Sequence, residues 1–233
     1  MNISIIYQDS DIVAINKPAG IAVHKGVAEK GKTLADWLAE KFPEIKKVGD
    51  EPKVRPGIVH RLDKDTSGVL VAARNQKTFE FLKYLFQSRN IIKKYLVLVE
   101  GDLKNDKGII NLPISRSRSD FRKKLASERA RGESREAVTE YKVLEKFPDY
   151  TLVEAYPKTG RTHQIRVHFK AIGHPVVCDS LYGGKRMTCP HGLKRHFLHA
   201  NFLEFTTLSG IRLKLEADLP ADLSKVLEGL RKK

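Results

Sequence analysis

Residues 60–71 of this chain read HRLDKDTSGVLV. The stretch places two carboxylates, Asp63 and Asp65, one residue apart in an otherwise basic surrounding. Small turn residues follow, and the apolar run VLVAAR after them predicts a buried strand over residues 69–74. The segment therefore joins a charged turn directly to a core strand, and the rest of the fold can be laid out on either side of it.

Short apolar runs and amphipathic segments alternate upstream of this stretch. Residues 5–8 and 12–17 are apolar runs joined by turn residues, and residues 21–26 also read as a short strand. Residues 32–42 carry apolar side chains at helical spacing, which predicts an amphipathic helix. The N-terminal part is thus expected to combine strands with one helix.

The same alternation continues downstream. The expected elements are a helix over 76–89 capped by Asn75, strands over 90–101, 150–157, 195–208 and 211–217, a strand or helix over 161–169, and a C-terminal helix over 220–231. Helices and strands are interspersed without a regular strand–helix–strand order. This pattern favours an α+β fold around a mainly antiparallel sheet over a doubly wound parallel sheet.

The charge balance points to a polyanionic partner. The 233 residues include 43 Lys and Arg against 28 Asp and Glu, a net charge of +15. Such a surplus favours nucleic acid, which basic proteins bind through phosphate contacts, although an ordinary basic enzyme is the alternative. Residues 115–135 concentrate Arg and Lys with little apolar material, so they are expected to form an exposed loop or hairpin that grips RNA or is simply solvated.

Composition also bounds the setting. With 41% hydrophobic residues the chain reads as globular. The sequence contains no apolar run of about 18 residues, so no membrane span is predicted. The N-terminus lacks the features of a signal peptide. The two cysteines, Cys178 and Cys189, are too few for a disulfide scaffold, so a reducing, cytoplasmic setting is expected.

The two carboxylates of residues 60–71 admit several readings. They match the first positions of an EF-hand loop, but the position that needs a bidentate glutamate holds Arg74. A zinc site of Cys189 with the nearby histidines follows no usual ligand spacing, and no Gly-rich phosphate loop is present. Two readings stay open: a carboxylate acting as nucleophile or general base among arginines, and aspartates that only shape a turn.

The stretch HRLDKDTSGVLVAA resembles the signature H-R-L-D-x-x-T-S-G-hydrophobic of the RluA-like family of RNA pseudouridine synthases. Other segments resemble further motifs of that family in the family's order. They are NKPAGIAVH (16–24), KKYLVLVEG (93–101), EAVTEYKVLE (136–145), TGRTHQIRVHF (159–169) and GHPVVCDSLYG (173–183). Together these matches span about residues 5–205.

The resemblance implies a mixed, largely antiparallel central β-sheet flanked by helices and loops. It implies a single catalytic domain over residues 1–233, because the NKPAG segment starts too near the N-terminus for the S4 RNA-binding domain of many relatives. The implied reaction converts uridine in rRNA or tRNA to pseudouridine, with no cofactor and no metal. A monomer is the default, and the alternative function is a catalytically silent RNA-binding or ribosome-assembly protein on the same scaffold.

The resemblance also assigns residues. The catalytic positions are Asp63, Tyr95 and Arg161, and the RNA-binding positions are Arg61, His60, Ile165, Arg118, Arg122 and Lys123. Asp63 initiates cleavage of the glycosidic bond, Tyr95 stacks on the target base, and Arg161 pairs with the aspartate. Arg61 takes the place of the flipped base, Ile165 lines an apolar pocket, and Asp65 is left to the turn.

Overall fold

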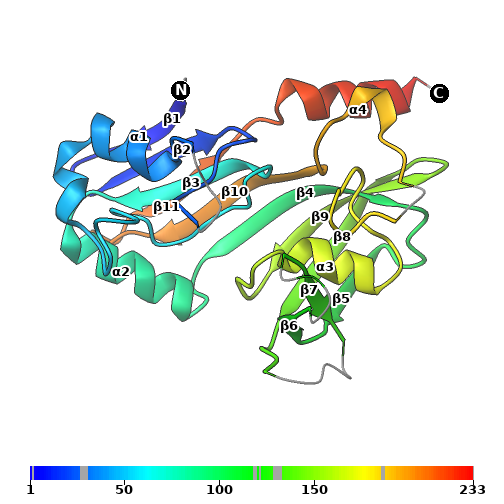
Figure 1. Ribbon diagram of the computed structural model, residues 1–233, viewed down its shortest axis with the longest axis horizontal. Helices are drawn as coiled ribbons and strands as arrows, with labels where there is room; N and C mark the ends of the chain where they lie inside the picture. Colours follow the sequence, from blue (N-terminus) through cyan, green and yellow to red (C-terminus); the bar gives the residue numbers. More distant parts are fainter. Residues whose placement is uncertain are drawn as a thin grey trace. The chain divides into compact units, whose positions relative to one another are not determined.

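The computed structural model describes residues 1, 3–26, 31–117, 120, 122–127, 133–184 and 187–232. The chain divides into two compact units. The first comprises Met1–Ile92 and Ala200–Asp218, and the second comprises Lys93–His199 and Leu219–Lys233. Figure 1 labels the elements of both units, and each unit is described below by itself.

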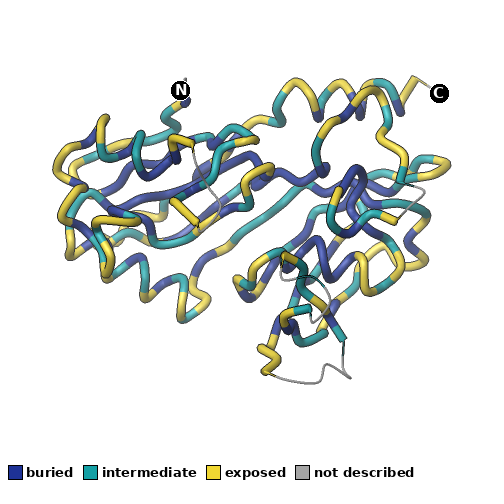
Figure 2. Tube along the Cα trace, in the orientation of Figure 1, coloured by how far each residue is buried: buried dark blue, intermediate teal, exposed yellow. Residues whose placement is uncertain are grey.

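The first unit is built on antiparallel strand pairs. Its strands are β1 (Ser4–Gln8), β2 (Ile12–Lys17), β3 (Ser67–Ala73), β10 (Leu198–Thr206) and β11 (Arg212–Glu216). They are ordered β1-β2-β3-β10, with β11 on β10. All seven residues of β3 are buried, as Figure 2 shows, so the predicted core strand after the charged turn is confirmed.

Two helices and a 3₁₀ turn complete the first unit. They are α1 (Leu34–Lys41), η1 (Pro43–Lys47) and α2 (Gln76–Gln87). A capping box between Thr33 and Asp36 starts α1, and the Asn75 side chain accepts from the amide of Thr78 to start α2. The apolar face of α2 packs on side chains of β3 and β10 in one buried cluster.

The second unit places a helix on each face of a four-stranded arrangement. Its strands β4 (Ile92–Glu100), β9 (Tyr150–Pro157), β8 (Val138–Lys146) and β5 (Lys107–Asn111) are ordered β4-β9-β8-β5 and pair antiparallel. A hairpin of β6 (Ile114–Arg116) and β7 (Lys124–Ala126) falls within the basic segment. This hairpin agrees with the loop or hairpin expected there.

The alternation of side chains along β4 and β9 explains why this unit is covered on both faces. Val97 and Val153 pack with α3 (Gln164–Ala171), whereas Leu98 and Leu152 pack with α4 (Ala221–Arg231). Successive residues of a strand point to opposite faces, so an unbroken apolar run needs cover on both. The 3₁₀ turn η2 (Pro190–Gly192) precedes β10.

The mixed, mostly antiparallel fold with flanking helices is confirmed, with two refinements. Residues 161–169, which fitted a strand or a helix, contain the start of α3. The expectation of a strand over residues 21–26 is wrong. There the carbonyls of Ala22 and Val23 accept hydrogen bonds from the amides of Leu34 and Ala35 at the start of α1, at 2.9 and 2.8 Å, in place of a strand partner.

The two cysteines form a disulfide. Cys178 and Cys189 are bonded, with their Cα atoms 5.0 Å apart. One bridge is not a disulfide scaffold, but it closes a loop that carries Asp179 and Tyr182, both of which contact Arg166 of α3. The pairing could not be predicted from the sequence, because it depends on the tertiary turn at Cys178, whose φ is +59°.

Opening this bridge is expected to lower the free energy of unfolding by about 3 kcal/mol, the loop-closure entropy for two cysteines with a sequence separation of 11. Urea denaturation of the oxidised protein, the protein reduced with dithiothreitol and the Cys189→Ser variant measures the difference. The variant and the reduced protein should share one midpoint. Equal midpoints for the oxidised and reduced wild type would contradict the prediction.

Candidate active site

The charged turn of residues 60–71 is fixed at its end by a glycine. The amide of Thr66 donates to the carbonyl of Asp63 at 3.1 Å, which closes a four-residue turn just before β3. Gly68 has φ +122°, and a Cβ there would lie 2.2 Å from the carbonyl oxygen of Ala200 on β10. Only glycine fits both the backbone angle and the close approach. Asp63 is half-buried in this turn, whereas Asp65 is exposed.

A buried lysine ties the turn to the N-terminal motif. Lys17 has no exposed surface, and its Nζ donates to the carbonyls of Pro18, Ile21 and Lys64 at 2.8, 2.9 and 3.0 Å. The amide of Gly20 donates to the same Lys64 carbonyl at 2.9 Å. The sequence marked this lysine only as part of the NKPAG motif and gave it no role. The structure makes it the anchor of the segment that carries Asp63.

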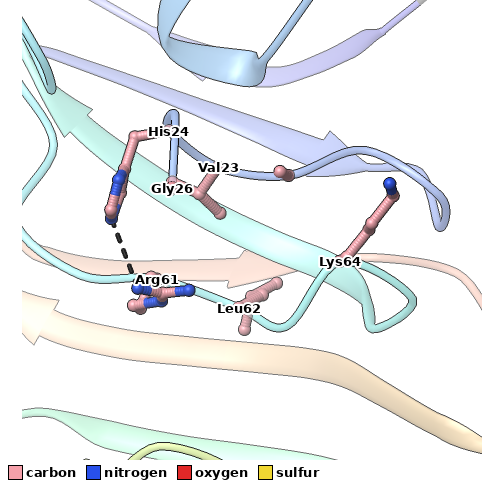
Figure 3. Close-up of a pocket in the computed structure, with 7 residues that line it drawn as sticks. Val23, His24, Gly26, Arg61, Leu62 and Lys64 are labelled. Carbon is pink, nitrogen blue, oxygen red and sulfur yellow. Dashed lines mark hydrogen bonds between the residues drawn. The ribbon is translucent and has the colours of Figure 1, made fainter. Parts of the chain in front are cut away.

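His60 and Arg61 precede the aspartate in different environments. The His60 ring stacks on Phe86 with centroids 4.4 Å apart, and its Nε2 accepts from the amide of Val71 at 3.0 Å. Because a backbone N–H donates to it, this nitrogen carries no proton. Arg61 is exposed, and its Nη1 lies 3.4 Å from Nε2 of His24. Figure 3 marks this contact with a dashed line. His60 is thus held against the core, and Arg61 faces solvent.

In the second unit, Tyr95 and Ile165 belong to one apolar cluster. Tyr95 lies on β4 opposite Ala155 of β9 and is half-buried. Ile165 comes from the first turn of α3 and is 6% exposed. Both pack against the same core, which also contains Phe169. The structure therefore brings together two of the predicted site residues from segments about 70 residues apart.

Arg161 sits in a tightly bonded turn before α3. Its amide donates to Oε1 of Gln164 at 3.0 Å, and its Nε donates to the carbonyl of Glu136 at 3.1 Å. The Gln164 oxygen also accepts from the hydroxyl of Thr159 at 2.6 Å, while its Nε2 donates to the carbonyl of Val138 at 2.9 Å. The buried Gln164 amide therefore ties the turn that presents Arg161 to the start of β8.

A buried histidine continues the same network. Nε2 of His168 lies 3.0 Å from the carbonyl of Leu112, and Nδ1 lies 3.0 Å from the hydroxyl of Thr139. A carbonyl can only accept, so Nε2 carries the proton and Nδ1 accepts from the hydroxyl. Burial lowers the pKa of His168, because the charged imidazolium would lose its hydration.

The basic hairpin is tied to α3 through Tyr182. The Tyr182 hydroxyl accepts from the amide of Lys124 on β7 at 2.8 Å and lies 2.9 Å from Nδ1 of His163. Behind it, Arg166 and Asp179 form a buried bidentate ion pair at 2.6 and 2.8 Å. Burial by itself would raise the pKa of Asp179. The hydrogen bonds and charge of Arg166, the nearby His196 and the amide of Leu181 together outweigh burial and hold that pKa below its usual value.

The structure describes two of the three predicted RNA-binding residues of the basic segment. Arg122 is exposed and bonds Asp120 through Nε and Nη2 at 3.0 and 2.9 Å. This contact lowers the pKa of Asp120 to about 2. Lys123 is half-buried next to it, and Arg118 lies outside the described residues.

The predicted site residues are thus shared between the two units. His60, Arg61 and Asp63 belong to the first, and Tyr95, Arg161, Ile165, Arg122 and Lys123 belong to the second. In the part of the chain that the structure describes, no helix is long and apolar enough to cross a membrane. Within the same residues, no three His, Cys, Asp or Glu side chains gather as a group that could hold a metal ion.

A family model described as RNA pseudouridylate synthase matches residues 11–171, more than half of the chain. The chain belongs to this family. The RNA pseudouridine synthases are isomerases, and the matched region contains every motif on which the resemblance was based except the last. The family expected from the sequence is confirmed.

Similar proteins that are named as RNA pseudouridine synthases support the same family. The chain is 39% identical over its whole length to an uncharacterized RNA pseudouridine synthase of Bacillus subtilis, and it spans 74% of that protein. It is 42% identical over 78% of its length to the ribosomal large subunit pseudouridine synthase D of Borreliella burgdorferi, of which it spans 55%. With synthase C of Vibrio vulnificus it shares 36% identity over 97% of its length and spans 69% of that protein.

Solved structures support the fold. Human RNA pseudouridylate synthase domain containing 4 superposes on 98% of this chain with a TM-score of 0.77, at 29% identity, and 93% of that structure is covered. The structure of human RNA pseudouridylate synthase domain containing 1 superposes on the whole of this chain with a TM-score of 0.72, at 28% identity, and 96% of that structure is covered. The architecture of this chain is therefore that of the pseudouridine synthases.

Replacing Lys17 by Met is expected to lower the free energy of unfolding by about 2–4 kcal/mol, since three carbonyls lose the buried, charged donor that they share. Lys41→Met, which removes an exposed lysine of α1, serves as the matched control and should change stability by less than about 0.5 kcal/mol. Guanidinium denaturation measures both. Equal stability of the two variants would contradict the anchoring role of Lys17.

Stability is expected to fall with acid partly through His168. In the unfolded chain its pKa is about 6.5, and in the fold burial holds the pKa lower. As the pH falls, His168 is therefore protonated in the unfolded state before it is protonated in the folded state. Its contribution to the free energy of unfolding is complete above about pH 6.5 and decreases as the pH drops toward the folded pKa. His168→Gln should be less stable than wild type at pH 8 but lose less between pH 7 and 5 by urea denaturation. An unchanged slope would refute this assignment.

Proposed function

We propose that this protein isomerises specific uridines of RNA to pseudouridine, with Asp63 as the reacting carboxylate. The observation that carries the proposal is the construction of the Asp63 turn. Lys17 fixes the Lys64 carbonyl immediately after the aspartate, and Gly68 allows the close contact with β10 that ends the turn. A carboxylate held by this much backbone structure suits a reaction that needs fixed geometry.

The proposed reaction breaks the bond between C1′ of the ribose and N1 of uracil and forms a bond from C1′ to C5. Asp63 initiates the cleavage, and the freed base rotates within the site. The proton leaves C5 and N1 gains one, so the atoms balance without an oxidant or a cofactor. Tyr95 stacks on the base and takes part in removing the C5 proton.

Arg161 is proposed as the cation that accompanies the Asp63 carboxylate during the reaction. A guanidinium beside a carboxyl favours the ionised form, which is the form able to attack or to act as a base. Support comes from the locked turn of Arg161, in which Gln164 and Glu136 bond its amide and its Nε. Those two bonds leave the Nη groups of the guanidinium for a carboxylate.

RNA binding is proposed to follow from base flipping. A uracil inside a helix must leave the stack before it can be isomerised, and Arg61 takes its place there. Ile165 forms the apolar wall for the flipped base, and His60 orients the motif from the core. Arg118, Arg122 and Lys123 of the basic segment 115–135 contact phosphates, in keeping with the net charge of +15.

The target is proposed to be ribosomal RNA, because several similar proteins are named for the large ribosomal subunit; tRNA is the other outcome of the test. The whole chain is proposed to act as a single catalytic domain and as a monomer in the cytoplasm.

Asp63→Asn should reduce pseudouridine formation by at least about 10³-fold, because an amide is neither a nucleophile nor a base at neutral pH. Tritium release from rRNA transcribed with 5-tritiated uridine measures the activity. Asp65→Asn, an exposed change two residues away, is the matched control and should stay active.

The same variants identify the substrate and test a purely binding role. A pseudouridine map of rRNA and tRNA from a deletion strain, complemented with wild type or Asp63→Asn, locates the modified uridines. Activity that survives in Asp63→Asn would remove Asp63 from the reaction. An unchanged map beside a ribosome defect would favour an RNA-binding or ribosome-assembly protein.

A further inference from the structure

A hollow lies beside the Asp63 turn, within the first unit (Figure 3). Its volume is about 210 Å³, several times the roughly 30 Å³ that one water molecule occupies in the liquid. One wall consists of Ala22, Val23, His24 and Gly26, and the other of Arg61, Leu62 and Lys64. The hollow is therefore large enough for a group bigger than a water molecule or a bare ion.

The lining has an apolar floor and basic ends. Val23 and Leu62 are 3% and 4% exposed and form the floor. Figure 3 shows the His24–Arg61 pair on one side of these two residues and Lys64 on the other. Among the described residues that line the hollow there is no acid. The arrangement fits an occupant with an uncharged middle and a negative charge at each end.

Hydrogen bonds order part of each wall without a ligand. The carbonyls of Ala22 and Val23 are held by the first amides of α1, and the carbonyl of Lys64 is held by Lys17. At the other end Nη1 of Arg61 donates to Nε2 of His24 at 3.4 Å, which draws the guanidinium toward the hollow. A site whose walls are already ordered loses little entropy on binding.

We propose that this hollow binds the ribose of a nucleotide next to the target uridine, together with its two flanking phosphates. The inference rests on the proposed function. Leu62 and Lys64 both line the hollow and both adjoin Asp63 in the sequence, so its occupant adjoins the reacting nucleotide. The ribose lies on Val23 and Leu62, and one phosphate meets Lys64. The other phosphate accepts from the N–H edge of Arg61, whose planar guanidinium stacks through its faces in the place of the flipped base. With Arg61 and Lys64 on the phosphates and His24 on Arg61, no side chain of the lining is left to read a base edge, so recognition is independent of the neighbouring base.

Uridine 3′,5′-bisphosphate, adenosine 3′,5′-bisphosphate, uridine 5′-monophosphate and inorganic phosphate are the probes. Amide chemical shifts of the labelled full chain locate binding, and titration gives the dissociation constants. Both bisphosphates should shift Val23, His24 and Leu62 with affinities within about twofold of each other, because no base is read. The monophosphate and inorganic phosphate should bind at least about fivefold more weakly, because each lacks one charged contact.

Variants then assign the two ends. Lys64→Met should weaken both bisphosphates by about fivefold, and His24→Phe, which keeps a ring but removes the acceptor for Arg61, should weaken them by a smaller factor. Lys214→Met, an exposed charge change on β11, is the matched control and should bind as wild type.

Shifts confined to other residues, a preference for uridine over adenosine, or equal weakening by Lys64→Met and Lys214→Met would each overturn the proposal. These readouts involve no turnover. Loss of the proposed isomerase activity without loss of bisphosphate binding would therefore refute the function of Asp63 while leaving this site intact.

Discussion

The ammonium group of Lys17 is the constraint on which the first unit of the structure depends. Removing a cation from water costs several kcal/mol, and the cost is offset only where its donors are bonded. Here three carbonyls accept from it, and one of them lies 47 residues away along the chain. One buried charge thereby fixes the NKPAG turn and the segment after Asp63 in a single arrangement. The same bond orders a wall of the hollow beside Asp63.

In the second unit, an uncharged buried side chain has the role that Lys17 has in the first unit. The side-chain amide of Gln164 is buried, and it bonds the turn of Arg161 to the start of β8. Thr139 and His168 extend the bonding to Leu112, next to the basic hairpin. A buried polar network of this kind tolerates only one geometry, because each unpaired group would be costly. Asp63 and Arg161, which are proposed to react, thus lie on backbone segments that are held by buried hydrogen bonds.

Much of the fold could be predicted from local patterns. The strand β3 and the helices α1 and α2 lie close to where apolar spacing and capping residues placed them. Patterns were insufficient where a distant partner decides the conformation. Residues 21–26 have the composition of a strand, yet their carbonyls cap α1. Residues 161–169 suited either element, and packing of Ile165 and Phe169 on the core selects the helix.

For the site, the sequence by itself determined the family, the two motifs that contain Asp63 and Arg161, and the basic character that suits RNA. It could not separate Asp63 from Asp65 by spacing alone, since both would point to one face of a strand. The tertiary structure decided that Asp63 is half-buried and Asp65 exposed, that Lys17 is an anchor, and that His24 reaches Arg61. These features depend on contacts between segments far apart in the chain, and such contacts leave no periodic trace in the sequence around them.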